Sequence, residues 1–108
     1  MKPNLSRSAD GRHDQANSHL SLNLHREFFV AILTGKKKTE YRENTVYWRK
    51  RLAGRIYREI HFRNGYATKA PFMRVECLGI RRPSGTQGGV FAIRLGRVLE
   101  RKYCTKMA

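Results

Sequence analysis

The spacing of apolar residues changes from two to four within one short stretch of this sequence, and no other feature constrains the fold as strongly. In Leu20–Leu24, leucine alternates with a small polar residue, which is typical of a half-buried strand. In His25–Thr34, pairs four residues apart such as Phe28 with Ile32 form one apolar helix face. Gly35 follows, as expected where a helix ends. A strand therefore passes directly into a helix, which predicts a small domain that combines the two.

The rest of the sequence predicts more strands than helices. Alternating patterns bounded by turn residues predict four further strands around a second short helix at Thr45–Ala53, namely Lys36–Glu43, Arg55–Arg63, Phe72–Arg81 and Val90–Tyr103. This order predicts an α+β, mostly β fold. We expect a small β-barrel of about five to six strands with one or two helices beside it, because closure leaves no strand edge exposed.

Basic residues outnumber acidic residues along the whole chain. Lys and Arg total 23 and Asp and Glu total 8 in 108 residues, which gives a net charge of +15. Between residues 19 and 104 the totals are 19 and 6, so the excess belongs to the body of the domain rather than to a tail. This charge favours a polyanionic partner, and nucleic acid above all. No apolar run approaches the roughly 20 residues that cross a bilayer, so we expect no membrane partner.

The two ends of the chain and the two thiols suggest the domain limits and the compartment. Residues 1–18 are polar, and we expect a disordered arm there, then one domain over 19–104 and a C-terminal tail over 105–108. Cys77 and Cys104 have no paired metal-ligand spacing, and two thiols cannot form the disulfide framework of a small secreted protein. We therefore predict a cytoplasmic protein without a metal or a cofactor.

The residues best suited to binding or catalysis lie together in Gly35–Glu43, which reads G-K-K-K-T-E-Y-R-E. Three consecutive lysines follow the first predicted helix and lead into a strand. Alternation along that strand places Glu40 and Arg42 on one face, where they can pair or line a cleft. The alternative interpretation is a solvated strand with three solubilising lysines.

Taken with the apolar helix before it, Ile32–Arg42 resembles the motif of the ASCH family, G-x-K-x-x-E-x-R. Ile60–Tyr66, Val75–Ile80 and Phe91–Gly96 are similar to later strands of that family, so the resemblance covers about residues 19–101. It implies a PUA-like β-barrel with a cleft beside the first helix. It also implies an association with RNA, and some members of the family are hydrolases.

The family motif matches this sequence at Gly35, Lys37, Glu40 and Arg42. The resemblance implies that Lys37 holds a phosphate or polarises a carbonyl, that Arg42 acts similarly through its fork of donors, and that Glu40 is a general base or accepts from a base edge. N4-acetylcytidine amidohydrolases of the family carry Thr where Glu40 stands. Thr39 lies one place earlier and faces the other way, so this activity is the less favoured one.

Two functions follow as alternatives. The first is a module that binds RNA or a nucleotide in a basic cleft, with binding residues expected at Lys36, Lys37, Lys38, Glu40, Arg42, Arg49 and Tyr66. The second is an RNA-directed hydrolase, either a metal-independent ribonuclease or an amidohydrolase, with Lys37 and Glu40 as its catalytic residues. His61 is a weaker candidate base, because alternation places it on the polar side of its strand. Trp48 is expected to anchor the second helix to the core together with Leu52.

Overall fold

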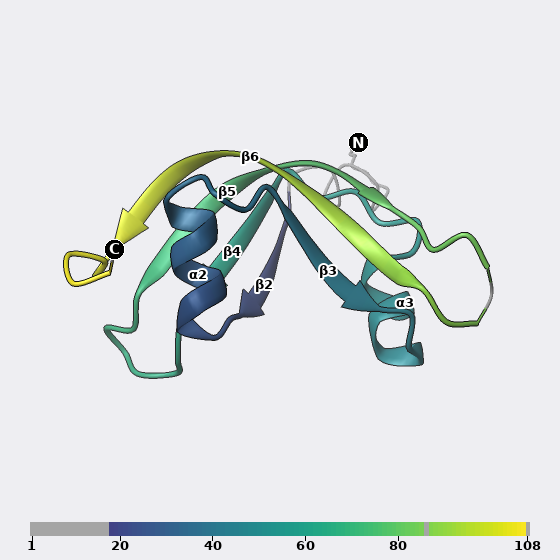
Figure 1. Cartoon of the computed structure of the whole chain (residues 1–108), viewed down its shortest axis with the longest axis horizontal. Helices are drawn as coiled ribbons and strands as arrows, with labels where there is room; N and C mark the ends of the chain where they lie inside the picture. The colour runs from purple at the N-terminus through teal and green to yellow at the C-terminus, as the bar shows by residue number, and fades with distance from the viewer. Residues whose placement is uncertain (1–17, 86, 108) are drawn as a thin grey trace, which may run out of the picture.

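The computed structural model describes residues 18–85 and 87–107, which form one curved sheet and two helices (Figure 1). The elements in chain order are β2 (His19–Asn23), α2 (Arg26–Leu33), β3 (Thr39–Glu43), α3 (Val46–Leu52), β4 (Glu59–Arg63), β5 (Phe72–Arg81) and β6 (Val90–Lys102). The α+β, mostly β class expected from the sequence is confirmed. The expected N-terminal arm falls outside the described residues, apart from Ser18.

The sheet is built on the two long strands β5 and β6, and its strand order is β2-β4-β5-β6-β3. β2 runs parallel to β4, and the other neighbours are antiparallel. β4 pairs with Phe72–Glu76 of β5, whereas β3 pairs with Val90–Arg94 at the other end of the long hairpin. Between these two halves the β5–β6 register shifts repeatedly from Arg74 to Gly79. Such irregularities bend a sheet, and here the result is an arch (Figure 1).

The sheet does not close into a barrel, and this corrects the sequence-based expectation. β2 and β3 are both edge strands, and neither pairs with the other. The space between them is lined by Leu22 of β2, Arg42 of β3 and Trp48 of α3. A hollow therefore separates the two strands, and no hydrogen-bonded ladder joins them. The domain is therefore a half-barrel with two open edges (Figure 1).

The core lies where the helices meet the sheet. α2 buries part of the face predicted from its spacing: Phe29, Ile32 and Leu33 are inaccessible or nearly so, whereas Phe28, expected on the same face, is 43% exposed. α3 contributes Leu52, and the strands contribute a continuous apolar layer of Leu22, Ile60, Phe62, Met73, Val75, Phe91, Ile93 and Leu95. Burial of each large apolar side chain contributes roughly 1.5–3 kcal/mol to stability. No described helix has both the length and the apolar character needed to span a membrane.

Some predicted boundaries differ from the structure because local hydrogen bonds override the pattern. β3 begins at Thr39 rather than Lys36, since the Lys37 N–H donates to the Ala31 carbonyl (2.9 Å) and keeps the lysines in a connection after α2. β4 begins at Glu59 rather than Arg55. In the segment assigned to a C-terminal tail, Met107 is buried and joins the core.

Candidate nucleic-acid interface

Lys37, Glu40 and Arg42 converge in one ion-pair cluster beside β3. Glu40 is only 7% exposed, although it carries a charge. Lys37 Nζ lies 3.4 Å from Glu40 Oε1. Arg42 donates to Glu40 Oε2 from Nε at 3.1 Å and from Nη2 at 2.9 Å. Each carboxylate oxygen therefore faces a different cation, and the cluster as a whole keeps one positive charge.

Aromatic rings hold both cations of this cluster from the outside. The Arg42 guanidinium lies 4.8 Å from the centroid of the Trp48 ring, and Lys37 Nζ lies 5.2 Å from that of Tyr41. Trp48 is placed by the N-terminal cap of α3, where Thr45 Oγ1 accepts from the Trp48 N–H at 3.2 Å. Arg42 is thus fixed between a carboxylate and an indole, and no described residue accepts from its Nη1. That N–H group is free to meet a ligand.

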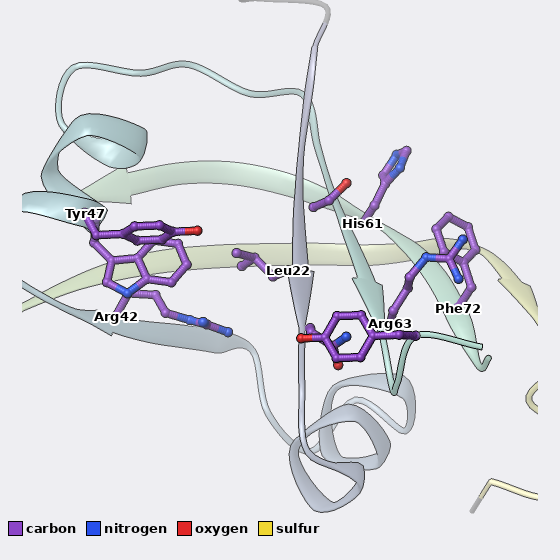
Figure 2. Close-up of a pocket in the computed structure, with 10 residues that line it drawn as sticks. Leu22, Arg42, Tyr47, His61, Arg63 and Phe72 are labelled. Atoms are coloured by element: carbon purple, nitrogen blue, oxygen red, sulfur yellow. The ribbon is translucent and has the colours of Figure 1, made fainter. Parts of the chain in front are cut away.

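A hollow with a volume of about 440 Å³ lies around the free edge of β2. This volume is within the range of about 300–1,000 Å³ that is usual for ligand sites. Its lining is formed by Ser21, Leu22, Asn23, Arg42, Tyr47, Trp48, His61, Arg63, Tyr66 and Phe72. Arg42 and Tyr47 lie on one side of β2, and His61, Arg63 and Phe72 lie on the other (Figure 2). The lining combines aromatic rings with arginines, and none of the described residues that form it carries a carboxylate.

The second side of the hollow is held by contacts across β2, β4 and β5. The Arg63 guanidinium lies 5.5 Å from the Phe72 ring centroid. The His61 ring stacks on His19, with centroids 3.8 Å apart, and its Nε2 lies 2.9 Å from Glu59 Oε1. Burial lowers the pKa of His61, and this outweighs the hydrogen bond to Glu59, which raises it. The imidazole is therefore neutral at neutral pH, and the arginines supply the positive charge of the hollow.

Tyr66 stands at the rim of the hollow as a free aromatic side chain. It is 91% exposed. Its loop is tied to β2, because Asn23 Nδ2 donates to the Gly65 carbonyl at 3.1 Å and the Gly65 N–H donates to Asn23 Oδ1 at 3.0 Å. Asn64 Nδ2 adds a bond to the Leu24 carbonyl at 2.9 Å. The main chain next to Tyr66 is thus fixed while its ring stays open to solvent.

The residues predicted as binding residues are divided among three depressions. Arg42 and Tyr66 line the main hollow. Lys37 and Lys38 line a separate one beside the C-terminal end of α2, together with Arg97 and Arg101 of β6. Arg49 lines a third with Asn44 and Arg82, and Lys36 is exposed.

The position of the main hollow also differs from the expected cleft beside the first helix. α2 supplies none of its lining residues, whereas α3 supplies Tyr47 and Trp48. Glu40 is buried in its ion pairs instead of facing the hollow. The physical reason is the open seam, because the gap between β2 and β3 creates a hollow that a closed barrel would not have.

The sequence did not predict most of the second side of the hollow, which contains His61, Arg63 and Phe72 (Figure 2). Arg63 and Phe72 were not considered as site residues, and β2 was treated only as a core strand. The available signal was alternation, which places Ser21 and Arg63 on the polar side of adjacent strands. Alternation alone does not show that these two strands are neighbours. The parallel pairing of β2 with β4, which sets Asn23 opposite Arg63, is needed to bring their polar sides together.

Neither metal-site geometry nor comparison with other proteins supplies a further assignment. Within residues 18–85 and 87–107, no group of three or more His, Cys, Asp or Glu side chains is arranged to hold a metal ion. No family model, curated protein or solved structure matches the chain. The geometry of the hollow is therefore the basis for a function.

Proposed function

We propose that this protein is an RNA-binding domain that holds an unpaired stretch of RNA in the hollow around β2. The observation that supports this most directly is the lining itself, in which the described residues include four aromatic side chains together with Arg42 and Arg63 and no carboxylate. Aromatic faces stack on unpaired bases, and arginines neutralise phosphates. The resemblance to the ASCH family points to the same class of ligand.

In this proposal Glu40 positions Arg42 instead of reacting. Its Oε2 accepts from two nitrogens of the guanidinium, which leaves Nη1 for a phosphate. Its Oε1 faces Lys37. A general base needs reach to the group it deprotonates, and Glu40 is absent from the lining of the hollow. These contacts favour binding over the hydrolase alternative.

The proposal is tested by removing one aromatic face and one cation that the fold does not need. Tyr66→Ala should weaken binding of a single-stranded RNA by about 5- to 150-fold, since stacking contributes about 1–3 kcal/mol per base. Arg63→Ala should reduce the slope of log affinity against log salt by about 0.7. Fluorescence anisotropy with labelled oligonucleotides at several salt concentrations measures both effects.

The matched control is Tyr103→Asn, which removes another exposed tyrosine ring outside the hollow. Tyr103 has a left-handed backbone (φ 58°) that Asn tolerates. Equal loss of affinity in Tyr66→Ala and Tyr103→Asn, or an unchanged salt slope in Arg63→Ala, would show that binding is diffuse and does not use the hollow. Appearance of RNA fragments with the wild-type protein would instead support hydrolysis.

A further inference from the structure

Strand β2 turns a row of unpaired main-chain groups toward the hollow. Along a strand, the N–H and C=O of successive residues point alternately to its two edges. At one end the Ser18 carbonyl accepts from the Arg58 N–H (3.1 Å), and at the other the Leu24 N–H donates to the Arg63 carbonyl (2.8 Å). Even-numbered residues of β2 therefore bond with β4. The N–H and C=O of Ser21 point to the opposite, free edge.

Ser21 lies at the middle of this edge and also lines the hollow. Among residues 18–85 and 87–107, no strand pairs with β2 on that side, because β2 stands at one end of the strand order. Arg42 and Tyr47 lie across the gap from β2 (Figure 2), and Trp48 also lines the hollow. Ser21 thus offers one donor and one acceptor side by side, next to aromatic faces and a cation.

We propose that the main chain of Ser21 recognises the Watson–Crick edge of an unpaired base, an inference that rests on the proposed RNA-binding function. The Watson–Crick edge of each standard base carries a donor and an acceptor next to one another, which complements the N–H and C=O of a single strand residue. The base stacks on the ring of Tyr47 or of Trp48, which stand at 84° to one another, and Arg42 meets a neighbouring phosphate. The site therefore requires a base that is free of a pairing partner.

An extended peptide is the other ligand that can bind a strand edge. A peptide would use the same main-chain groups, but it offers neither the flat faces nor the regular negative charge that suit this lining. Both sides of β2 carry an aromatic ring with an arginine over it, Trp48 with Arg42 and Phe72 with Arg63. Charge and shape therefore favour a nucleotide over a peptide.

The experiment removes one hydrogen-bond donor from the free edge and nothing from the sheet. Ser21→Pro deletes the outward N–H, and proline is tolerated in an edge strand where the N–H faces away from the ladder. Ser21→Ala is the matched control, because it removes the hydroxyl and keeps the main chain. The probes are four unmodified homo-octanucleotides and matched octamers whose Watson–Crick edges carry neutral methyl groups, such as 3-methyluridine.

We expect Ser21→Pro to weaken binding of the preferred unmodified octamer by about two- to tenfold, as for one lost hydrogen bond, with an unchanged salt slope. Ser21→Ala should bind like the wild type. The methylated octamer should bind the wild type and Ser21→Pro equally. If Ser21→Pro binds unmodified RNA as tightly as Ser21→Ala does, the main-chain contact is absent and the proposal is wrong.

Amide hydrogen exchange of the wild-type protein gives a second readout that does not depend on how well the proline variant folds. Addition of the preferred octamer should slow exchange at Ser21 and leave Leu22, whose N–H faces β4, unchanged. RNA binding that requires Tyr66 but does not protect Ser21 would overturn this inference and leave the proposed function in place. Protection of Ser21 by self-association without RNA would identify the edge as a site for another chain and would also overturn it.

Discussion

Two ion-pair clusters on this domain have opposite compositions. Beside β3, one carboxylate lies between two cations, as Glu40 contacts both Lys37 and Arg42. Across β4, β5 and β6, one cation lies between two carboxylates, as Arg74 contacts Glu59 and Glu100, each at 2.7 Å. The first cluster is buried around its carboxylate, whereas the side chains of the second are about a third exposed.

This difference separates charges that hold the sheet together from charges that are available to a ligand. The Arg74 cluster joins three neighbouring strands, and its carboxylates leave no surplus positive charge. The Glu40 cluster has more cations than anions, and its Arg42 lines the hollow. An excess of cations beside aromatic rings favours an anionic ligand, whereas a network with more carboxylates than cations does not, and on the sheet it contributes to local order. Each prediction below tests this distinction.

The largest expected effect is the loss of stability in Glu40→Gln. This change leaves Lys37 and Arg42 close together without the charge that holds them, and breaking a largely buried ion pair is costly. Because both cations are partly exposed, we expect a loss of about 2 kcal/mol, or a fall in Tm of about 8–16 °C for a domain of this size. Urea denaturation measures the change. Glu43→Gln, on the same strand but exposed, is the control, and an equal loss there would contradict the prediction.

The next effect concerns affinity in Arg42→Lys. The charge is kept, but a lysine cannot both bond to Glu40 through two nitrogens and lie flat on Trp48. We expect RNA affinity to fall about 5- to 10-fold, as for one lost charge-assisted hydrogen bond, with nearly the same salt slope. Anisotropy titrations measure both. Unchanged affinity together with an unchanged salt slope would mean that Arg42 acts only as a point charge.

Arg74→Gln should affect stability less than Glu40→Gln does and should leave RNA binding unchanged. The Arg74 cluster is more exposed, so water screens its charges. Paired denaturation and anisotropy measurements on Arg74→Gln and Glu40→Gln compare the two clusters directly. A substantial loss of RNA affinity in Arg74→Gln would show that the Arg74 cluster also contributes to the ligand site.

The smallest effect is the pH dependence of stability that arises from His61 and Glu59. Burial lowers the pKa of His61 below its ordinary value of 6.5, and hydrogen bonds from Arg74 and His61 lower the pKa of Glu59 below 4.5. In each case the unfolded chain takes up a proton first. The stabilisation is therefore complete above the ordinary value and is lost as the pH falls through the folded-state pKa.

His61→Asn should accordingly reduce the fall in unfolding free energy between pH 7 and pH 5. Urea denaturation of the wild type and the variant at these two pH values measures the difference. The direction of the change decides the prediction. If the unfolding free energy of the wild type rose relative to that of His61→Asn as the pH fell from 7 to 5, His61 would bind its proton more readily in the folded state, and the prediction would be wrong.

The sequence predicted the elements well because most of them are marked by local signals. β5 was predicted with its observed ends, Phe72–Arg81, and α2 was predicted within one residue at each end. Glu40 and Arg42 were placed on one face, which their ion pair agrees with. These successes depend on spacing within a single segment.

The missing parts of the site are long-range. The parallel pairing of β2 with β4 and the open seam between β2 and β3 depend on how distant segments meet. Spacing also does not show that Glu40 would form ion pairs with two cations and lie outside the lining of the hollow. Arg63 and Phe72 become neighbours only through the β4–β5 register, so no pattern within one strand could join them.

The bend at Arg74–Gly79 has a consequence for the evolution of ligand size. One wall of the hollow is attached to the beginning of β5 and the other to the beginning of β6. The bend of the β5–β6 hairpin between these two points therefore sets the distance between the walls. Gly79, with φ of 143°, stands at that bend in a conformation that other residues rarely adopt. The width available to a ligand thus depends on Gly79, which lies outside the lining of the hollow. A substitution there would change this width without any change in the lining residues.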